Sequence, residues 1–593
     1  MRVAISLLIA LLGAGIQIPA PSEADDVLLQ LSKIRLDKKQ IHVIRDVTLG
    51  RDAASITLNR GVIAFLEPVN GRVTGAVFLG SGEVVAIPPD RIERQQISRF
   101  TGTPILNERF QTAVLRFSDG TFEELKKEIS QHAPEEVSEE DVAQFDPFDT
   151  VLAGRSPALN LRLLADLLEP AGKRFFHAEL NGEKSGWFNV VFDLRATEEL
   201  SVFQIRPFAT ASVLDVWASF HQRSEARNPE VVAHETKLPV DVLSYEVEGA
   251  NGLGNNIDAK ATLRVKARTD AARVLNFDLG PGFRVSSVLA DKDEPLPYYQ
   301  SPGLNGVWVV LPNPVKAAQE LTLRFAYGGD VSAAGPWYPS QRQETIPSFK
   351  SSFALPADRS VTVEYSGRKV VPASYHDQWL VEGLTRYLAA MATEPTDSGT
   401  QLRQLLNGLR EEMRPVESAG AISLGQRLAS SMSPDAYRVV YAKGVWVIHM
   451  LRMMLKQKGP DADAKFLAML KDFADTFGGR SVSTWDFKRL AEKHADQQLN
   501  WFFDQWVFAA GLPSYSVDYK VEGSGNEFTV AGEITQSGVP DGFIMPVPLY
   551  ADTEYLGNVQ VGESEGQFKF RLRAKPERLL IDPQMTILTA NPQ

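Results

Sequence analysis

The hydrophobic period of this chain changes twice along its length, and the changes restrict the fold. Before Tyr375, apolar runs alternate with polar residues at a period of two, as in "NRGVIAFLEPVNGRVTGAVFLG", which is typical of β-strands. Between Tyr375 and about Gly511 the apolar residues recur every three or four positions, which is the helical repeat. After Ser514 the period of two returns. The sequence therefore predicts a multidomain α+β chain in which β-rich regions flank a helical one.

The length of 593 residues also favours several domains, because a single hydrophobic core stops growing well below this size. Shifts in pattern give the boundaries. We predict a signal peptide over 1–24, an N-terminal α+β domain over 25–227, a β domain over 228–374, a truncated helical domain over 375–511, and a C-terminal β-sandwich over 512–593.

The first residues predict export. Arg2 precedes an apolar run from Val3 to Leu12, and Ala24 ends a plausible cleavage site. A membrane anchor is the weaker interpretation, because this run is too short to cross a bilayer and no later run is long enough. We therefore expect a secreted or periplasmic protein without a transmembrane span.

Composition excludes two kinds of site. The chain contains no cysteine, so disulfides, thiolate metal ligands and a thiol nucleophile are absent, and any metal site must use His, Asp or Glu. The formal net charge of −12 offers no basic field for phosphate backbones, so we expect no nucleic-acid partner.

Several linked motifs carry a family resemblance. The stretches "WLVEGLTRYLA", "YAKGVWVIHML" and "LNWFFDQWVFAAGLPSYSV" follow one another in the helical region, after "WYPSQRQETIPSFKSSFALPA" in the β domain. In this order they resemble the gluzincin zinc aminopeptidases, the family of membrane alanyl aminopeptidase and leukotriene hydrolase. The resemblance implies a zinc cofactor and peptide substrates. It also implies that Glu382 is the third zinc ligand and that Tyr441 supplies the hydroxyl that stabilises the oxyanion.

The chain departs from that family at the main zinc motif. The family binds zinc with two histidines one helical turn apart, in H-E-x-x-H. Family spacing would put the first histidine at Arg359, where the residues read "RSVTV" in a strand-like pattern, and none of the eight histidines begins an H-x-x-x-H pair. The family's G-x-M-E-N segment is absent as well. We infer an internal deletion near Val371 that removes the metal-binding element and leaves its downstream partners.

Other readings of the remaining polar residues stay open. His376, Glu382 and His449 could form a rebuilt metal site, although no recognised spacing links them. Glu382 could instead stabilise a helix N-terminus by about 0.3–1 kcal/mol. Tyr441 could be an amphipathic core residue. The spacing of Ser483 and Asp486 predicts a helix start with a capping box.

The sequence leads to three alternative hypotheses about function. We expect an exported aminopeptidase-like protein, catalytically impaired or inactive, that binds a peptide or protein and holds zinc weakly or not at all. The first alternative is an active zinc metalloaminopeptidase, with a rebuilt metal site or a sequence shortened by the deletion. The second is a structural or assembly module built around residues 25–227. The deletion further predicts an exposed apolar cleft along Leu384, Tyr387 and Leu388.

Overall fold

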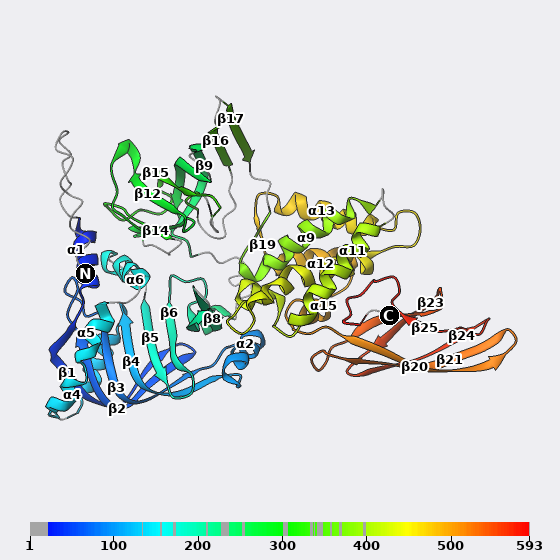
Figure 1. Cartoon of the computed structure of the whole chain (residues 1–593), viewed down its shortest axis with the longest axis horizontal. Helices are drawn as coiled ribbons and strands as arrows, with labels where there is room; N and C mark the ends of the chain where they lie inside the picture. Colours follow the sequence, from blue (N-terminus) through cyan, green and yellow to red (C-terminus); the bar gives the residue numbers. More distant parts are fainter. Residues whose placement is uncertain are drawn as a thin grey trace.

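The computed structural model describes residues 22–591 apart from 133–134, 154–156, 170–173, 209–210, 227–236, 252–254, 301–305, 333–335, 337, 341–347, 356–358, 367–369 and 395–398 (Figure 1). The predicted signal peptide lies outside the described residues except for 22–24. Ser22 caps the first helix and Ala24 is buried in it, so a cut after Ala24 would remove a capping box. No helix among the described residues is long and apolar enough to cross a membrane.

The N-terminal region contains one eight-stranded sheet in which each strand pairs antiparallel with the next along the chain. Both faces are covered: Val77 and Phe78, adjacent on β3, belong to two different hydrophobic clusters. The strands are β1 (Leu36–Arg51), β2 (Ala54–Leu66), β3 (Gly75–Ala86), β4 (Leu106–Phe117), β5 (Phe175–Gly182), β6 (Gly186–Asp193), β7 (Leu200–Phe208) and β8 (Ala211–Phe220).

Seven helices accompany this sheet among the described residues. Helices α1 and α6 pack on one face and bury Val27 and Leu164, whereas α2 contributes Ile97 to the cluster on the other face. Their bounds are α1 (Glu23–Ser32), α2 (Arg91–Thr101), α3 (Thr121–Ser130), α4 (Glu139–Ala143), α5 (Asp146–Ala153), α6 (Pro157–Leu168) and α7 (Arg223–Ala226).

The second β region stacks two sheets. A six-stranded sheet of order β12-β15-β10-β9-β16-β17 faces a three-stranded sheet of order β11-β14-β13, and Phe277 meets Phe325 between them at 5.4 Å. The predicted β pattern around Arg359 is confirmed by strand β17. The strands are β9 (Val240–Asn251), β10 (Asn256–Ala267), β11 (Val274–Asp278), β12 (Phe283–Leu289), β13 (Tyr298–Gln300), β14 (Gly306–Val310), β15 (Glu320–Asp330), β16 (Ser348–Leu355) and β17 (Arg359–Ser366), with a 3₁₀ turn at η1 (Asp291–Asp293).

The helical region is built around α12, most of whose side chains are buried. Helices α9, α11, α13 and α14 contact it, and the short strands β18 (Val371–Pro372) and β19 (Ser481–Val482) pair in parallel beside α9. The helices are α9 (Gln378–Met391), α11 (Thr400–Met413), α12 (Arg438–Leu455), α13 (Ala464–Phe477), α14 (Thr484–Ala495) and α15 (Asn500–Trp506), and the 3₁₀ turns are η2 (Tyr375–Asp377), η3 (Arg414–Val416), η4 (Ile422–Leu428) and η5 (Pro434–Tyr437).

The C-terminal region is a small sandwich of two three-stranded sheets, as predicted. Its core is continuous with that of the helical region, because Trp446 and Val547 belong to one hydrophobic cluster. The sheets are β20 (Ser514–Ser524), β21 (Glu527–Ser537) and β24 (Glu565–Leu572), and β23 (Glu554–Val561), β22 (Met545–Ala551) and β25 (Leu579–Ile581). The multidomain α+β class is therefore confirmed (Figure 1).

The predicted exposed cleft is wrong at two of its three residues. Leu384 and Tyr387 are only 6% and 0% exposed, so the helical region closes over them, whereas Leu388 is partly exposed. Phe466 of α13 packs edge-on against Tyr387, and the Tyr387 hydroxyl contacts Arg452 and His449. The neighbouring helices therefore bury Leu384 and Tyr387, which the proposed deletion was expected to leave open.

Candidate functional site

The crossing of α9 and α12 sets the geometry of the predicted catalytic residues. The two helices meet at Gly383 and Gly444, where a Cβ on Gly444 would lie 2.6 Å from the backbone oxygen of Trp379. Only glycine permits so close an approach. Glu382 adjoins one glycine, and Tyr441 lies one turn before the other, so the crossing fixes both positions.

Glu382 lies on the solvent-exposed surface of α9. Its carboxylate makes no hydrogen bond or ion pair in the part of the chain that the structure describes. The predicted role at the helix N-terminus is wrong, because α9 begins at Gln378 and its first turn contains no acidic residue. The helix dipole acts mainly within that first turn.

Tyr441 is partly buried beneath a cation. The Arg386 guanidinium lies 4.2 Å from the centre of its ring, and Tyr437 meets the ring edge-on at 6.4 Å. Burial raises the pKa of the Tyr441 hydroxyl, which is therefore protonated near neutral pH. Arg386 is one helical turn after Glu382, so a positive charge already occupies the α9 surface that carries the predicted zinc ligand.

The two histidines of the possible rebuilt site are committed to other partners. His376 contacts the Ser423 carbonyl at 2.7 Å through Nδ1 and the Glu198 carboxylate at 2.9 Å through Nε2. His449 contacts the Tyr387 hydroxyl at 3.0 Å and the Met585 carbonyl at 2.8 Å. Burial lowers the pKa of His449 to about 4, so it is a neutral core residue.

The residues around Glu382 therefore do not fit zinc. A protein zinc site needs three or four nitrogen, oxygen or sulfur ligands, and among the described residues no cluster of three His, Asp or Glu ligand atoms includes Glu382. Both ring nitrogens of His376 and of His449 are already in contact with other groups. The sequence proposal of a His376, Glu382 and His449 site is not borne out by the geometry.

A different group has the composition of a metal site. Among the described residues, Glu199, His221 and Glu225 place one potential ligand atom each within 4.8 Å of one another. The Lys237 ammonium forms an ion pair with Glu199 and lies 3.5 Å from Glu225. Since a lysine already supplies the positive charge, this group is a salt-bridge cluster. The sequence did not predict this cluster, because Lys237 is distant from Glu199 along the chain and His221 belongs to no recognised motif.

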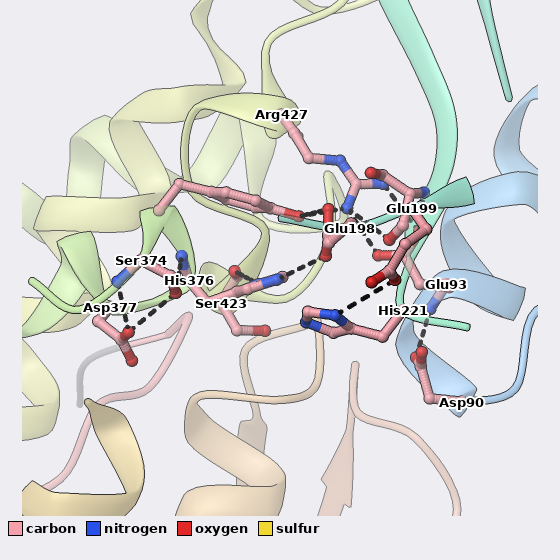
Figure 2. Close-up of polar contacts among 12 residues, drawn as sticks. Asp90, Glu93, Glu198, Glu199, His221, Ser374, His376, Asp377, Ser423 and Arg427 are labelled. Carbon is pink, nitrogen blue, oxygen red and sulfur yellow. Dashed lines mark hydrogen bonds and ion pairs between the residues drawn. The ribbon is translucent and has the colours of Figure 1, made fainter. Parts of the chain in front are cut away.

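A buried polar network joins the N-terminal sheet region to the helical region (Figure 2). Arg427 donates to both oxygens of Glu93, at 2.7 and 2.8 Å, and to the Tyr375 hydroxyl at 2.8 Å. The Tyr375 hydroxyl in turn donates to Glu198 at 2.7 Å, and His376 contacts the other oxygen of Glu198. Figure 2 shows Glu93 and Glu198 from the sheet region converging with His376 and Arg427 from the helical region.

The network shifts the titration of its members. Burial lowers the pKa of His376, but the hydrogen bond and charge of Glu198 raise it overall above the usual 6.5. Burial likewise raises the pKa of Glu198, yet His376 and Arg427 lower it overall to about 2. Both groups are therefore charged together over the mildly acidic range.

We expect the free energy of unfolding to fall as pH rises from 6 to 9. A histidine whose pKa is higher in the folded state stabilises fully below its unfolded pKa, and this contribution is lost as pH rises through the folded pKa. The Glu198 contribution remains throughout, since it is lost only as pH falls toward about 2. Urea unfolding of the native chain and of His376→Gln at both pH values measures the effect. An equal pH dependence in the two proteins would show that another group is responsible.

The comparison with protein-family models finds a match in the helical region. The family model for the Peptidase family M1 domain matches residues 362–506, which run from β17 to the last residue of α15. This helical region is a peptidase family M1 domain. The predicted family is thereby confirmed, and both Glu382 and Tyr441 lie inside the M1 domain.

Individual relatives match parts of the chain. Leucine aminopeptidase 2 of Eremothecium gossypii is 27% identical over 219 residues, which are 33% of this chain and 34% of that protein. The chain thus spans about a third of the curated relative that it matches. An M1 zinc metallopeptidase of Deinococcus radiodurans, solved as a mutant bound to a Tyr-Ser-Ala substrate, is 15% identical, with a TM-score of 0.37 over 46% of this chain and 96% of that one. A two-domain M1 zinc metallopeptidase mutant bound to L-arginine is 14% identical, with a TM-score of 0.33 over 46% and 95%.

The M1 domain is only one part of the molecule. The eight-stranded sheet and its helices lie outside the matched residues, and Glu93 and Glu198 reach the domain from that sheet region. The network was not predicted, because nothing local marks Arg427 in "LGQRL" as an ion-pair partner. The roles of Glu382 and Tyr441 in binding or catalysis stay predictions.

Proposed function

We propose that this chain is an exported M1-family protein, catalytically impaired or inactive as a zinc aminopeptidase, that acts by binding a peptide or another protein. The observation that best supports the loss of zinc-dependent activity is the environment of Glu382. The carboxylate is exposed beside Arg386, whose guanidinium packs on Tyr441 at 4.2 Å. A cation at this position opposes the binding of a divalent metal.

The segment before α9 supports the same proposal. The family's zinc helix would precede Glu382, but the chain there forms β16 and β17, which pair as antiparallel strands from Ser348 to Ser366. Two imidazoles at helical spacing cannot come from this segment, because its sequence contains no histidine. Without a bound metal, Tyr441 has no activated water to act upon.

The binding and export parts of the proposal rest on other observations. The M1 match over 362–506 and the aminopeptidase relative favour a peptide as the ligand. The apolar run from Val3 to Leu12 favours export to a secreted or periplasmic location. Zinc is then weakly held or absent in the folded protein.

The proposal is tested by metal content and hydrolysis together. After incubation of the purified chain with one equivalent of zinc chloride and desalting, we expect far less than one zinc per chain by mass spectrometry. Hydrolysis of leucine 4-nitroanilide should not exceed the buffer rate, and EDTA should not change it.

The test variant is Glu382→Gln and its matched control is Glu411→Gln, and both residues are at exposed positions of the M1 domain. Neither is expected to change zinc content. Stoichiometric zinc with EDTA-sensitive hydrolysis, lost in Glu382→Gln and kept in Glu411→Gln, would overturn the proposal and identify an active aminopeptidase.

A further inference from the structure

A cavity of about 620 Å³ lies between the N-terminal sheet region and the M1 domain. Its volume is in the range of small-ligand sites. We infer that this cavity binds the C-terminal residue of a peptide that ends in an aromatic or large apolar side chain. The inference rests on the proposed peptide-binding function and names its ligand.

Apolar side chains from both regions form the walls. Trp485 stacks on Phe508, with ring centres 5.2 Å apart and an angle of 25° between the planes. Trp485 is 37% exposed and Ile87, which also lines the cavity, is 39% exposed. Exposed large apolar residues that share one concave surface mark a binding site, because a ligand would remove both from water. The principal apolar lining residues are Ile87, Pro89, Ile92, Phe220, Trp485 and Phe508.

The carboxylates that line the cavity already have donors. Glu93 is held by Arg427, and Glu198 by Tyr375 and His376. Asp377 accepts from Ser374 and Thr484, and Asp90 accepts from the Glu93 backbone at 2.8 Å; the lining acids are Asp90, Glu93, Glu198 and Asp377. A cationic ligand would therefore have to displace existing bonds.

Two arginines that line the cavity are in the opposite position. Arg94 and Arg223 are exposed and line the cavity, and neither guanidinium group pairs with a carboxylate in the described part of the chain. The Arg94 Nε donates to the Pro88 carbonyl at 2.8 Å, which fixes the guanidinium close to the apolar walls. Guanidinium groups bind carboxylates well, since their geometry allows two parallel hydrogen bonds.

These features together select a ligand with an apolar body and one carboxylate. Stacked aromatic rings favour an aromatic side chain, and the two arginines favour the terminal carboxylate beside it. The C-terminal residue of a peptide carries both groups on one carbon. No group in the cavity is assigned to the peptide's amino end, so a peptide with an acetylated N-terminus should still bind.

The test is calorimetric titration of the full chain with N-acetyl-Gly-Gly-Phe, with its C-terminal amide, and with laurate. We expect the acid to bind at least tenfold more tightly than the amide. Trp485→Ala should weaken binding of the acid at least tenfold. The double variant Arg94→Gln, Arg223→Gln should lower the affinity for the acid to that for the amide.

Two substitutions at exposed positions outside the cavity lining, Trp187→Ala and Arg91→Gln, are the matched controls, and we expect wild-type affinity from both. Circular dichroism melting curves confirm that each variant folds. Equal binding of acid and amide, or acid binding unchanged in the cavity variants, overturns the cavity inference but leaves peptide binding standing. Failure of the native chain to bind either peptide overturns both the cavity inference and the proposed peptide binding. If laurate binds more tightly than the peptide acid, and Trp485→Ala abolishes this binding, the cavity ligand is a fatty acid and the peptide inference is overturned.

Discussion

Replacing Arg427 with alanine is expected to lower the free energy of unfolding by about 3–5 kcal/mol, because the change leaves buried carboxylates without a counter-charge. The Arg427 and Glu93 side chains are only 10% and 4% exposed, and Arg427 also donates to Tyr375. Glu198 accepts from Tyr375, so the loss reaches a second carboxylate. Urea denaturation followed by tryptophan fluorescence measures the shift.

The matched control is Arg414→Ala. Arg414 pairs with Glu411 at 3.2 Å, but both side chains are more than half exposed, at 54% and 61%. Exposed pairs contribute between 0 and about 1 kcal/mol, so this variant should unfold near the native midpoint. If Arg427→Ala were no more destabilised than Arg414→Ala, the network would not hold the two regions together.

Local patterns were enough to predict much of the helical region. Ser483 and Asp486 form the expected capping box at the start of α14, and α13 ends at Phe477, directly before Gly478 and Gly479. Both signals act within a few residues, so the sequence contains all the information that they need. Helix α11 lies inside the helical region predicted over 375–511, but it was not predicted as a separate helix, although Leu402, Leu406 and Leu409 have helical spacing and are buried.

The long-range contacts could not be predicted in the same way. Arg427 and Glu93 are 334 residues apart, and Tyr375 and Glu198 are 177 apart. Their proximity depends on how the sheet region docks on the M1 domain, which one sequence does not specify. The burial of Tyr387 was mispredicted for a related reason, because its cover comes from α13 and α12.

Glu382 shows the difference between ancestry and role. The motif "WLVEGLTRYLA" correctly indicated the M1 family, since it encodes the packing of α9 as well as the predicted ligand. Trp379 is fully buried with its indole donating to Thr484, and Gly383 makes the contact with α12. These packing needs remain whether or not a metal binds, so a motif of this kind identifies a fold more surely than a reaction.

The glycine contact between α9 and α12 leads to the second large effect. Gly444→Ala is expected to destabilise the protein by about 1–3 kcal/mol or more, because added atoms in a tightly packed core force the backbone to shift. The new Cβ would meet the Trp379 backbone oxygen at 2.6 Å, and backbone cannot rotate away as a side chain can. Alanine also has a higher helix propensity than glycine, by about 1 kcal/mol, so the steric cost must exceed this gain.

Gly408→Ala isolates that gain. Gly408 lies inside α11, and a Cβ there would meet nothing within 4 Å, so the substitution should stabilise by about 0.5–1 kcal/mol. The two variants make the same chemical change in helices of one domain and should move the urea midpoint in opposite directions. A stabilised Gly444→Ala would mean that α9 and α12 are not held in close contact. Glu382 and Tyr441 would then lose the fixed relationship on which any shared binding role depends.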